Sequence, residues 1–235
     1  MLTLPVTRLE IASIRQRLLT IDLDGQTFDY LAGQAALMGP HGQPTRRPYS
    51  IACSPERSKE MGAIQFLIAL DGGGDLDWAT PGALVDVDGP TGSFTLPTAI
   101  EAAWVLFVAG GTGIAPVRAM LDHTLRRHPL QRVSLLYSTR RSDEFAFLDE
   151  LRAHEREGRL EFHQTVTRDE DESWEGKRGR IGRDHFEAVL HDPASTLCFL
   201  CGPPALVVDS VATLRLLGVA EDAIRTEEWI RSTSR

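Results

Sequence analysis

The pattern of hydrophobic and polar positions along the chain changes about 100 residues from its start. Up to residue 97 the apolar runs are short, such as 63–70 (AIQFLIAL) and 83–87 (ALVDV), and turns that contain glycine or proline separate them. Many short strands between such turns are typical of an antiparallel barrel or sandwich. The first part of the chain therefore predicts an all-β domain.

From residue 102 onward, apolar runs alternate with segments of helical spacing. The runs have the length of buried strands and occupy residues 104–109, 132–138, 160–165 and 196–200. Helical spacing follows the first, second and fourth runs, over residues 116–127, 145–155 and about 204–217. Such alternation is typical of an α/β domain with a doubly wound parallel sheet. The sequence therefore predicts two domains, residues 1–98 and residues 99–235.

Composition and charge exclude several classes of function. The chain has 235 residues and a net charge of −8, which argues against binding to nucleic acid or to an anionic membrane. Residues 1–10 lack a signal-peptide pattern, and no apolar run approaches the roughly 20 residues that span a bilayer. Three cysteines are too few for a disulfide scaffold. Together these features predict a cytoplasmic protein.

Cys198 and Cys201 form a C-x-x-C pair at the end of the last predicted strand. Residues three apart on a strand point to opposite faces of the sheet, which argues against a zinc site or a dithiol pair. The seven histidines show no ligand spacing. We therefore expect no metal site.

The most informative segment is 110–116 (GGTGIAP), between the first strand and the first helix of the α/β part. Glycines let the backbone approach a phosphate closely, and the N-terminus of the following helix presents unpaired N–H groups and the positive end of its dipole. The spacing is not that of the G-x-G-x-x-G dinucleotide fingerprint. The flanking strand and helix favour a pyrophosphate site over a turn that needs glycine only for packing.

Two other loops follow strands of the same predicted sheet. Residues 201–204 (CGPP) follow the last strand, and together with the first loop they can outline one ligand cleft at the same sheet edge. Ser138, Arg140 and Arg141 follow the second strand, where the adenosine ribose of a dinucleotide lies in such folds. A serine with arginines there suits a 2′-phosphate, and a solvated loop fits the spacing equally well.

A further segment, Arg47-Pro48-Tyr49-Ser50, lies in the all-β half. An arginine can neutralise a phosphate, an aromatic ring can stack on a planar cofactor, and a hydroxyl can hydrogen-bond a ring nitrogen. Taken alone, the same four residues also describe a surface strand with an isolated arginine.

In order along the chain, these motifs resemble the ferredoxin–NADP reductase superfamily over nearly the whole sequence. The segments that carry the resemblance are RPYSIACSP (47–55), GPTGSF (89–94), GGTGIAP (110–116), LLYSTRRSDEFAFLDEL (135–151), WEGKRGRI (174–181), CGPP (201–204) and IRTEEW (224–229). The resemblance implies an N-terminal, flavin-binding antiparallel β-barrel of the Greek-key type and a C-terminal NADP-binding α/β domain.

The resemblance also implies roles for single residues in the flavin half. Arg47 would contact the flavin phosphate beside Pro48, Tyr49 would stack on the isoalloxazine, and Ser50 would lie near the flavin N5. Cys201 would lie by the nicotinamide, and Glu227 close to the active site. Ser50, Cys201 and Glu227 are therefore the expected catalytic residues.

In the coenzyme half, the implied contacts come from the three loops. Gly111, Thr112 and Gly113 would hold the NADP pyrophosphate, with Pro116 beginning the helix behind them. Ser138 and Arg140 would bind the 2′-phosphate, together with Arg141. Cys201, Gly202 and Pro203 would complete the nicotinamide end.

The chain departs from the family pattern at residues 74–77. Relatives usually carry Gly-x-x-Ser/Thr there, and this loop binds the flavin phosphate, whereas Gly74, Leu76 and Asp77 stand at the corresponding positions here. A carboxylate near an anion is repulsive unless it points away. FAD is the expected flavin, and FMN is the alternative. Trp229 occupies the place of an aromatic residue that many relatives have.

The expected function is transfer of hydride from NADPH, or from NADH, to the flavin. The reduced flavin then passes electrons to a separate protein, such as a ferredoxin or an oxygenase component. The resemblance implies an iron–sulfur protein as the acceptor, and this acceptor is expected to be a separate chain because this chain has no cysteine set for a cluster. The alternatives are a flavin reductase that releases reduced flavin and a nucleotide-binding regulatory subunit without turnover.

Overall fold

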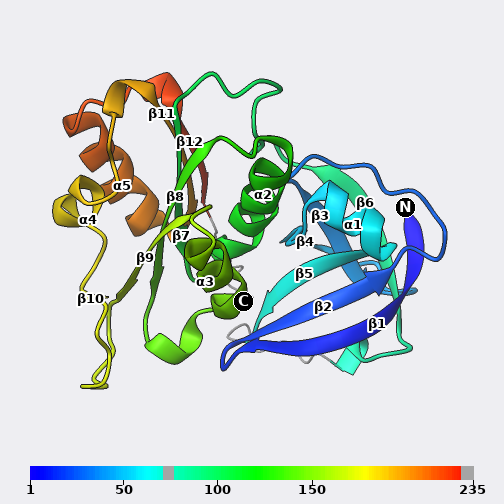
Figure 1. The fold of residues 1–235 in the computed structure, drawn as a ribbon. Coiled ribbons are helices and arrows are strands. Elements are labelled where there is room, and N and C mark those ends of the chain that lie inside the picture. The colour runs from blue at the N-terminus through cyan, green and yellow to red at the C-terminus, as the bar shows by residue number, and fades with distance from the viewer. Residues whose placement is uncertain (71–76, 229–235) are drawn as a thin grey trace.

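The computed structural model describes residues 1–70 and 77–228. Two six-stranded sheets form the molecule, one antiparallel and one parallel, and they lie side by side (Figure 1). The first is built by the N-terminal part of the chain and the second by the C-terminal part, as the change of pattern near residue 100 predicts.

The antiparallel sheet is a barrel with strand order β4-β3-β6-β1-β2-β5. A bridge between Ile51, next to β4, and Phe66 of β5 joins the two ends of this order. Large apolar side chains fill the interior, among them Leu4, Ile21 and Phe66. The strands are β1 (Leu2–Ser13), β2 (Gln16–Asp22), β3 (Ala35–Pro40), β4 (Arg47–Ser50), β5 (Ala63–Ala69) and β6 (Leu84–Thr91).

A short helix, α1 (Pro55–Met61), lies between β4 and β5 and is not predicted by the periodicity. Its signals are local: the Ser54 side chain accepts a hydrogen bond from the Arg57 N–H, Pro55 occupies the first turn, and Gly62 ends the helix in the left-handed region. These are ordinary helix caps. The helix is too short for an apolar repeat to reveal it.

The parallel sheet has strand order β10-β9-β8-β7-β11-β12, and every pair in it is parallel. Helices α2 and α3 cover the face toward the barrel, and α4 and α5 cover the other face (Figure 1). The elements are β7 (Trp104–Gly110), α2 (Ile114–Arg127), β8 (Arg132–Thr139), α3 (Leu148–Arg156), β9 (Glu161–Val166), β10 (Lys177–Arg178), α4 (Arg183–Glu187), β11 (Thr196–Gly202), α5 (Pro204–Leu216) and β12 (Ile224–Glu228).

One helix begins later than its spacing predicts. The segment expected to be helical from residue 145 starts instead at Leu148, because Phe147 adopts a left-handed backbone with φ 61°. A short 3₁₀ turn, Ser142–Glu144, precedes it. Helix α5 is followed by Gly218 at φ 96°, a left-handed conformation that is common just after the end of a helix.

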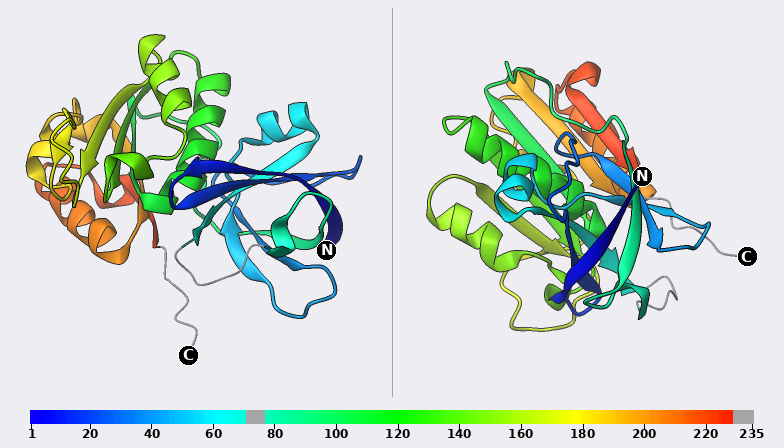
Figure 2. Two further views of the ribbon diagram at one scale, coloured as in Figure 1. Left: turned by 90° about the horizontal axis from the view of Figure 1, so that it is seen from below. Right: turned by 90° about the vertical axis from the view of Figure 1, so that its right-hand side faces the viewer.

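A continuous apolar core joins the two sheets. Ala52, Leu67 and Phe94 of the barrel pack in one cluster with Ala115 and Met120 of α2. The two further views in Figure 2 show α2 and α3 next to the barrel and α4 and α5 away from it. Within the described residues, no helix is long and apolar enough to cross a membrane.

Candidate active site

Two glycine loops meet where the parallel sheet changes direction. The chain proceeds from β7 to β8 on one side and returns to β11 on the other side of β7. In open α/β sheets, ligands bind at such a switch point, outside the carboxyl ends of the strands. The loops that leave β7 and β11 are Gly110–Gly113 and Gly202–Pro203, the two that the sequence singles out.

Both loops need glycine because their backbones touch. A Cβ on Gly113 would overlap the carbonyl oxygen of Cys201, and one on Gly110 would lie 2.9 Å from Pro203 Cδ. A Cβ on Gly202 would lie 3.1 Å from Gly110 Cα. Gly111 has a φ of +56° and open space on its Cβ side. The packing explanation therefore accounts for Gly110, Gly113 and Gly202 but not for Gly111.

A buried tyrosine that was not predicted from the sequence is hydrogen-bonded to the loop that follows β7. Tyr137 of β8 is fully buried, and its hydroxyl donates to the Gly111 carbonyl at 3.2 Å. The same hydroxyl accepts from the Ala146 N–H at 3.3 Å. The polar pattern around residue 137 gives no signal for these contacts, because both partners are backbone groups of loops outside β8.

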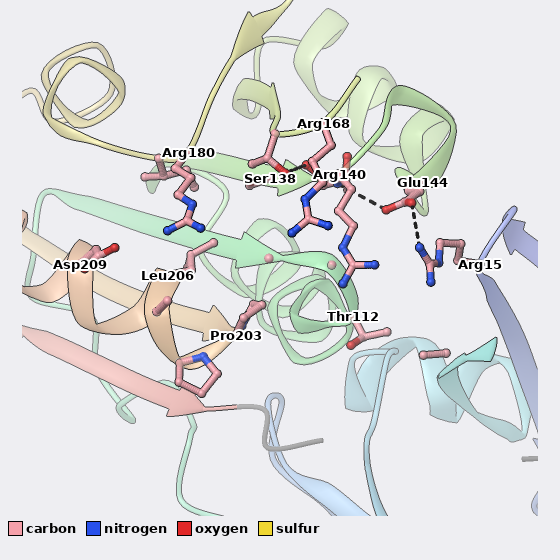
Figure 3. Close-up of a pocket in the computed structure, with 18 of the residues that line it drawn as sticks. Arg15, Thr112, Ser138, Arg140, Glu144, Arg168, Arg180, Pro203, Leu206 and Asp209 are labelled. Atoms are coloured by element: carbon pink, nitrogen blue, oxygen red, sulfur yellow. Dashed lines mark hydrogen bonds and ion pairs between the residues drawn. The ribbon is translucent and has the colours of Figure 1, made fainter. Parts of the chain in front are cut away.

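A pocket of about 540 Å³ opens in front of the two loops. Its walls come from the ends of β7, β8, β9 and β11, the start of α5 and the β1–β2 turn of the barrel (Figure 3). The lining residues include Gly110, Gly111, Thr112, Ser138, Thr139, Arg140, Glu144, Arg168, Arg180, Pro203, Leu206 and Asp209 from the α/β part, and Arg15, Gln16 and Ala69 from the barrel.

Four arginines give this pocket its charge. Figure 3 shows Arg140 and Arg168 beside Ser138, with Arg180 further along the wall and Arg15 entering from the barrel. Within residues 1–70 and 77–228, no carboxylate pairs with the side chains of Arg140, Arg168 or Arg180. Arg15 lies 3.5 Å from Glu144. The pocket therefore suits an anion with more than one negative charge.

The two arginines at 140 and 141 have different surroundings. Arg140 lines the pocket, and its backbone N–H donates to Glu144 at 3.3 Å. Arg141 is exposed and absent from the lining, and its guanidinium pairs with Asp143 at 3.1 Å. Of the residues expected at a 2′-phosphate, the structure thus brings Ser138 and Arg140 together at the pocket and leaves Arg141 outside.

The charged segment after β9 holds Arg168 and Arg180, and neither is among the site residues predicted from the sequence. The guanidinium of Arg178 donates to the carbonyl oxygens of Asp169 and Asp171, both at 2.6 Å. Trp174 stacks on Phe145, with ring centroids 5.6 Å apart. These contacts fold the segment back on itself, so that both of its ends reach the pocket.

A second cluster joins the three residues expected to be catalytic. Glu227 of β12 lies opposite Cys201 of β11 in the strand register, and the thiol donates to the Glu227 carboxylate across 3.8 Å. Burial raises the pKa of Glu227, while hydrogen bonds from Cys201 and Ser50 act in the opposite direction. Burial also raises the pKa of Cys201 well above its usual value, with a further contribution from Glu227. The thiol is therefore protonated and serves as a donor.

Tyr49 and Arg47 extend from β4, which pairs with β3. Tyr49 is half-buried, and burial raises the pKa of its hydroxyl while the charge of Arg47 opposes the shift. Arg47 and Pro48 are exposed. Gly74, Leu76 and Trp229 lie outside the described residues, as does the side chain of Asp77, so the expectations for them stay predictions.

The two cysteines of the C-x-x-C pair lie on opposite faces of the sheet, as their spacing predicts. Cys198 packs in the cluster on the α5 side, and Cys201 packs in the cluster on the α2 side. Both are free thiols. Among the described residues, no group of three or more histidines, cysteines or carboxylates is arranged to hold a metal ion.

Comparison with known proteins identifies relatives of both halves. The family model described as "Oxidoreductase NAD-binding domain" matches residues 107–211. Ferredoxin–NADP reductase B of Sorangium cellulosum (strain So ce56) is 32% identical over 198 residues, which cover 78% of this chain and 78% of that protein. The xylene/toluene monooxygenase electron transfer component XylA of Pseudomonas putida is 30% identical over 191 residues, covering 78% of this chain and 53% of that one.

The fold agrees with solved structures. A ferredoxin NADP⁺ reductase from Neisseria gonorrhoeae with bound FAD and NADP has a TM-score of 0.81 at 22% identity, and the match covers 97% of this chain and 98% of that one. This likeness confirms the expected arrangement of an antiparallel barrel and a parallel α/β sheet. With the sequence identity to Ferredoxin–NADP reductase B, it shows that the chain belongs to the ferredoxin–NADP reductase superfamily of NAD(P)H-dependent flavin oxidoreductases.

Proposed function

We propose that this protein is an NADPH-dependent flavoprotein reductase that passes electrons to a separate acceptor protein. The observation that carries the proposal is the pocket at the switch point of the sheet, where three arginines without a carboxylate partner among the described residues face the glycine loop. The cluster of Ser50, Cys201 and Glu227 begins directly behind that loop.

The residues present fit a phosphorylated dinucleotide. A volume of about 540 Å³ lies in the usual range for ligand pockets, and the backbone amides at the start of α2 can bind a pyrophosphate. Gly111, Thr112 and Gly113 would hold that group. Ser138 and Arg140 would hold the 2′-phosphate, and Arg168 and Arg180 would supply further positive charge.

NADPH is favoured over NADH by the charges of the pocket. Two carboxylates line it, Glu144 and Asp209, and Arg15 lies beside the first of them. Apart from the Arg15–Glu144 pair, the pocket has one carboxylate, Asp209, and three arginines, Arg140, Arg168 and Arg180. A 2′-phosphate adds negative charge that these arginines can bind, whereas a 2′-hydroxyl leaves them solvated.

The residues at the barrel end fit a flavin, and we propose FAD. Arg47 would contact its phosphate, Tyr49 would stack on the ring system and Ser50 would hydrogen-bond near its reactive edge. A bound flavin would supply hydride acceptance from the nicotinamide and one-electron release to the acceptor. Cys201 and Glu227 would contribute an uncharged donor and a partly buried carboxyl behind the glycine loop.

The proposed acceptor is an iron–sulfur protein, such as a ferredoxin or an oxygenase component. The relative from Pseudomonas putida is an electron transfer component of a monooxygenase, and this chain spans about half of its length. With three cysteines, all buried, this chain has no ligand set for a cluster of its own. A cluster that accepts the electrons would therefore be held by residues outside this sequence, and we propose a separate protein.

The test is an anaerobic titration of FAD-loaded, desalted protein with NADPH and, separately, with NADH. We expect flavin absorbance that stays with the protein and bleaches with about one equivalent of NADPH, and more slowly with NADH. A protein that retains flavin but is reduced by neither coenzyme would contradict the proposal and favour a regulatory subunit. Flavin that separates from the protein on a second desalting column after the reduction would favour a flavin reductase that releases its product.

A further inference from the structure

A network of buried charges joins the two sheets along the side of α2 that faces the barrel. Arg118 and Asp122 lie one turn apart in α2, and each is only 4% exposed. Both bond to residues of the barrel. Buried charges persist only where partners compensate their lost hydration, so the contacts around these two residues are a specific feature of the interface.

Arg118 contacts both sides of the interface at once. Its Nη1 donates to the Ala52 carbonyl oxygen at 2.7 Å and to the Gln65 amide oxygen at 3.1 Å, both in the barrel. Its Nη2 and Nε donate to Glu150 of α3, at 2.8 and 3.1 Å. The guanidinium also lies 4.3 Å from the centroid of the Phe147 ring. Only the planar fork of an arginine can make these contacts together.

Arg57 of α1 completes the network from the barrel side. It donates to Asp122 at 3.0 Å and lies 3.1 Å from Glu150, so it bridges two carboxylates of the other sheet's helices. The Ser54 hydroxyl donates to Asp122 as well. Two arginines thus face two carboxylates, and the buried interface has no net charge from these four groups.

The position of Arg118 relates it to the proposed chemistry. Its barrel partner Ala52 follows Ser50 by two residues, and its own helix begins directly after Gly113. One side chain therefore connects the segment proposed to hold the flavin with the helix proposed to hold the coenzyme pyrophosphate. Hydride transfer needs the reacting atoms at about 3–3.5 Å, and a misplacement of about 1 Å can cost about 100-fold in rate.

We propose that Arg118 is a positioning residue, which fixes the spacing between the flavin half and the coenzyme half without touching either cofactor. The proposal rests on the proposed function for its kinetic consequence. Its structural consequence, a fixed distance between the barrel and the α/β sheet, does not depend on turnover.

The kinetic test compares Arg118→Met and Arg118→Lys with Arg215→Met, which removes an exposed arginine of α5 that pairs with Glu221. In stopped-flow reduction of FAD-loaded protein at saturating NADPH, Arg118→Met is expected to slow flavin reduction about 100-fold. Its dissociation constant for NADPH should change by less than about threefold, because no coenzyme contact is lost. Arg118→Lys, which keeps the charge without the fork, should be intermediate, and Arg215→Met should match the parent protein.

Glu150→Gln keeps the shape of the network and provides a milder variant, with an expected loss of about tenfold. If Arg118→Met does not fold, the rate of flavin reduction in Glu150→Gln tests the proposal in its place. Wild-type reduction rates in the Arg118 and Glu150 variants, or a loss confined to NADPH affinity, would overturn the proposal.

A second readout measures the spacing directly. Spin labels on Lys59→Cys in α1 and Arg156→Cys in α3 can be attached selectively, because the three native cysteines are buried. We expect a narrow distance distribution in the parent and in Arg215→Met, and a broadened one in Arg118→Met. An unchanged distribution would overturn the proposal. If the parent chain is not reduced by NADPH, the proposed function fails, while the label distances still decide the role of Arg118.

Discussion

Arg140 and Arg141 are neighbours in sequence, but only one of them lines the pocket. Arg140 is expected to bind the 2′-phosphate, whereas Arg141 is paired with Asp143. A charge-assisted hydrogen bond contributes about 1.5–3 kcal/mol, so Arg140→Ala should raise the KM for NADPH by about 10- to 100-fold. The KM for NADH should not change.

Arg141→Ala is the matched control for this prediction. It should leave both KM values unchanged in steady-state assays. Equal effects of the two substitutions on NADPH would mean that Arg141 leaves Asp143 and binds the coenzyme as the sequence motif implies.

Behind the glycine loops, Cys201 donates a hydrogen bond to Glu227. The thiol donates to the Glu227 carboxylate, and this hydrogen bond lowers a pKa that burial raises. Removing the donor in Cys201→Ala should therefore raise the pKa of Glu227 further. We expect single-turnover flavin reduction to slow by about tenfold, the loss of one hydrogen bond to a charged group.

The pH dependence of the same reaction shows in which direction the pKa of Glu227 moves. If reduction requires the Glu227 carboxylate to be charged, the acid limb of its pH–rate profile should move to higher pH in Cys201→Ala. Cys201→Ser, which keeps a donor, should restore much of the parent profile. A rate and a profile identical to those of the parent in Cys201→Ala would remove Cys201 from the reacting end of the site.

At the scale of elements, the strand order places the two glycine loops in contact. Because β7 and β11 are neighbours, the loop that leaves one strand touches the loop that leaves the other, and Gly113 lies against the Cys201 carbonyl. Gly113→Ala needs no unusual backbone angle but forces these loops apart. Overpacking of this kind costs about 1–3 kcal/mol, and we expect the Tm to fall by several degrees.

The control for Gly113→Ala is Gly182→Ala, at the start of α4. An added Cβ there has only one atom near it, the Arg180 carbonyl oxygen at 3.9 Å. Its free energy of unfolding should fall by no more than about 1 kcal/mol, because alanine is a poorer N-cap than glycine. A stable Gly113→Ala protein would show that the loops can separate without cost.

At the scale of the whole molecule, the charged interface should make stability depend on pH. Burial opposes ionisation of Asp122, but hydrogen bonds from Arg57, Ser54 and Arg126 outweigh it and lower its pKa to about 2. The unfolded pKa is about 3.9. The stabilisation is therefore fully present above about pH 4 and is lost as the pH falls toward 2.

Asp122→Asn tests this dependence. The variant should lose about 1–2 kcal/mol of unfolding free energy at neutral pH, a range that allows for partial solvent screening. Denaturant melts across a pH series should show the difference from the parent shrinking below pH 4. A difference that stays constant down to pH 2 would mean that the Asp122 charge does not support the interface.

Features that depend on neighbours along the chain could be predicted from the amino-acid sequence. The change in apolar spacing near residue 100 predicted two kinds of sheet, and the two-residue period of a strand predicted that Cys198 and Cys201 face opposite sides. The glycine loop at 110–116 was visible because a strand, a turn and a helix follow one another directly. Family resemblance added the barrel and the roles of single residues.

Which distant segments meet became known only from the folded structure. Arg168, Arg180 and Arg15 reach one pocket because β8 and β9 are adjacent and the β1–β2 turn of the barrel lies against them, and apolar periodicity contains no information on such neighbours. The same holds for Arg118, whose charge looks like that of a solvated helix position until the barrel covers it. Spacing along a chain fixes which face a side chain takes, whereas its partner depends on strand order and on the packing of one sheet against the other.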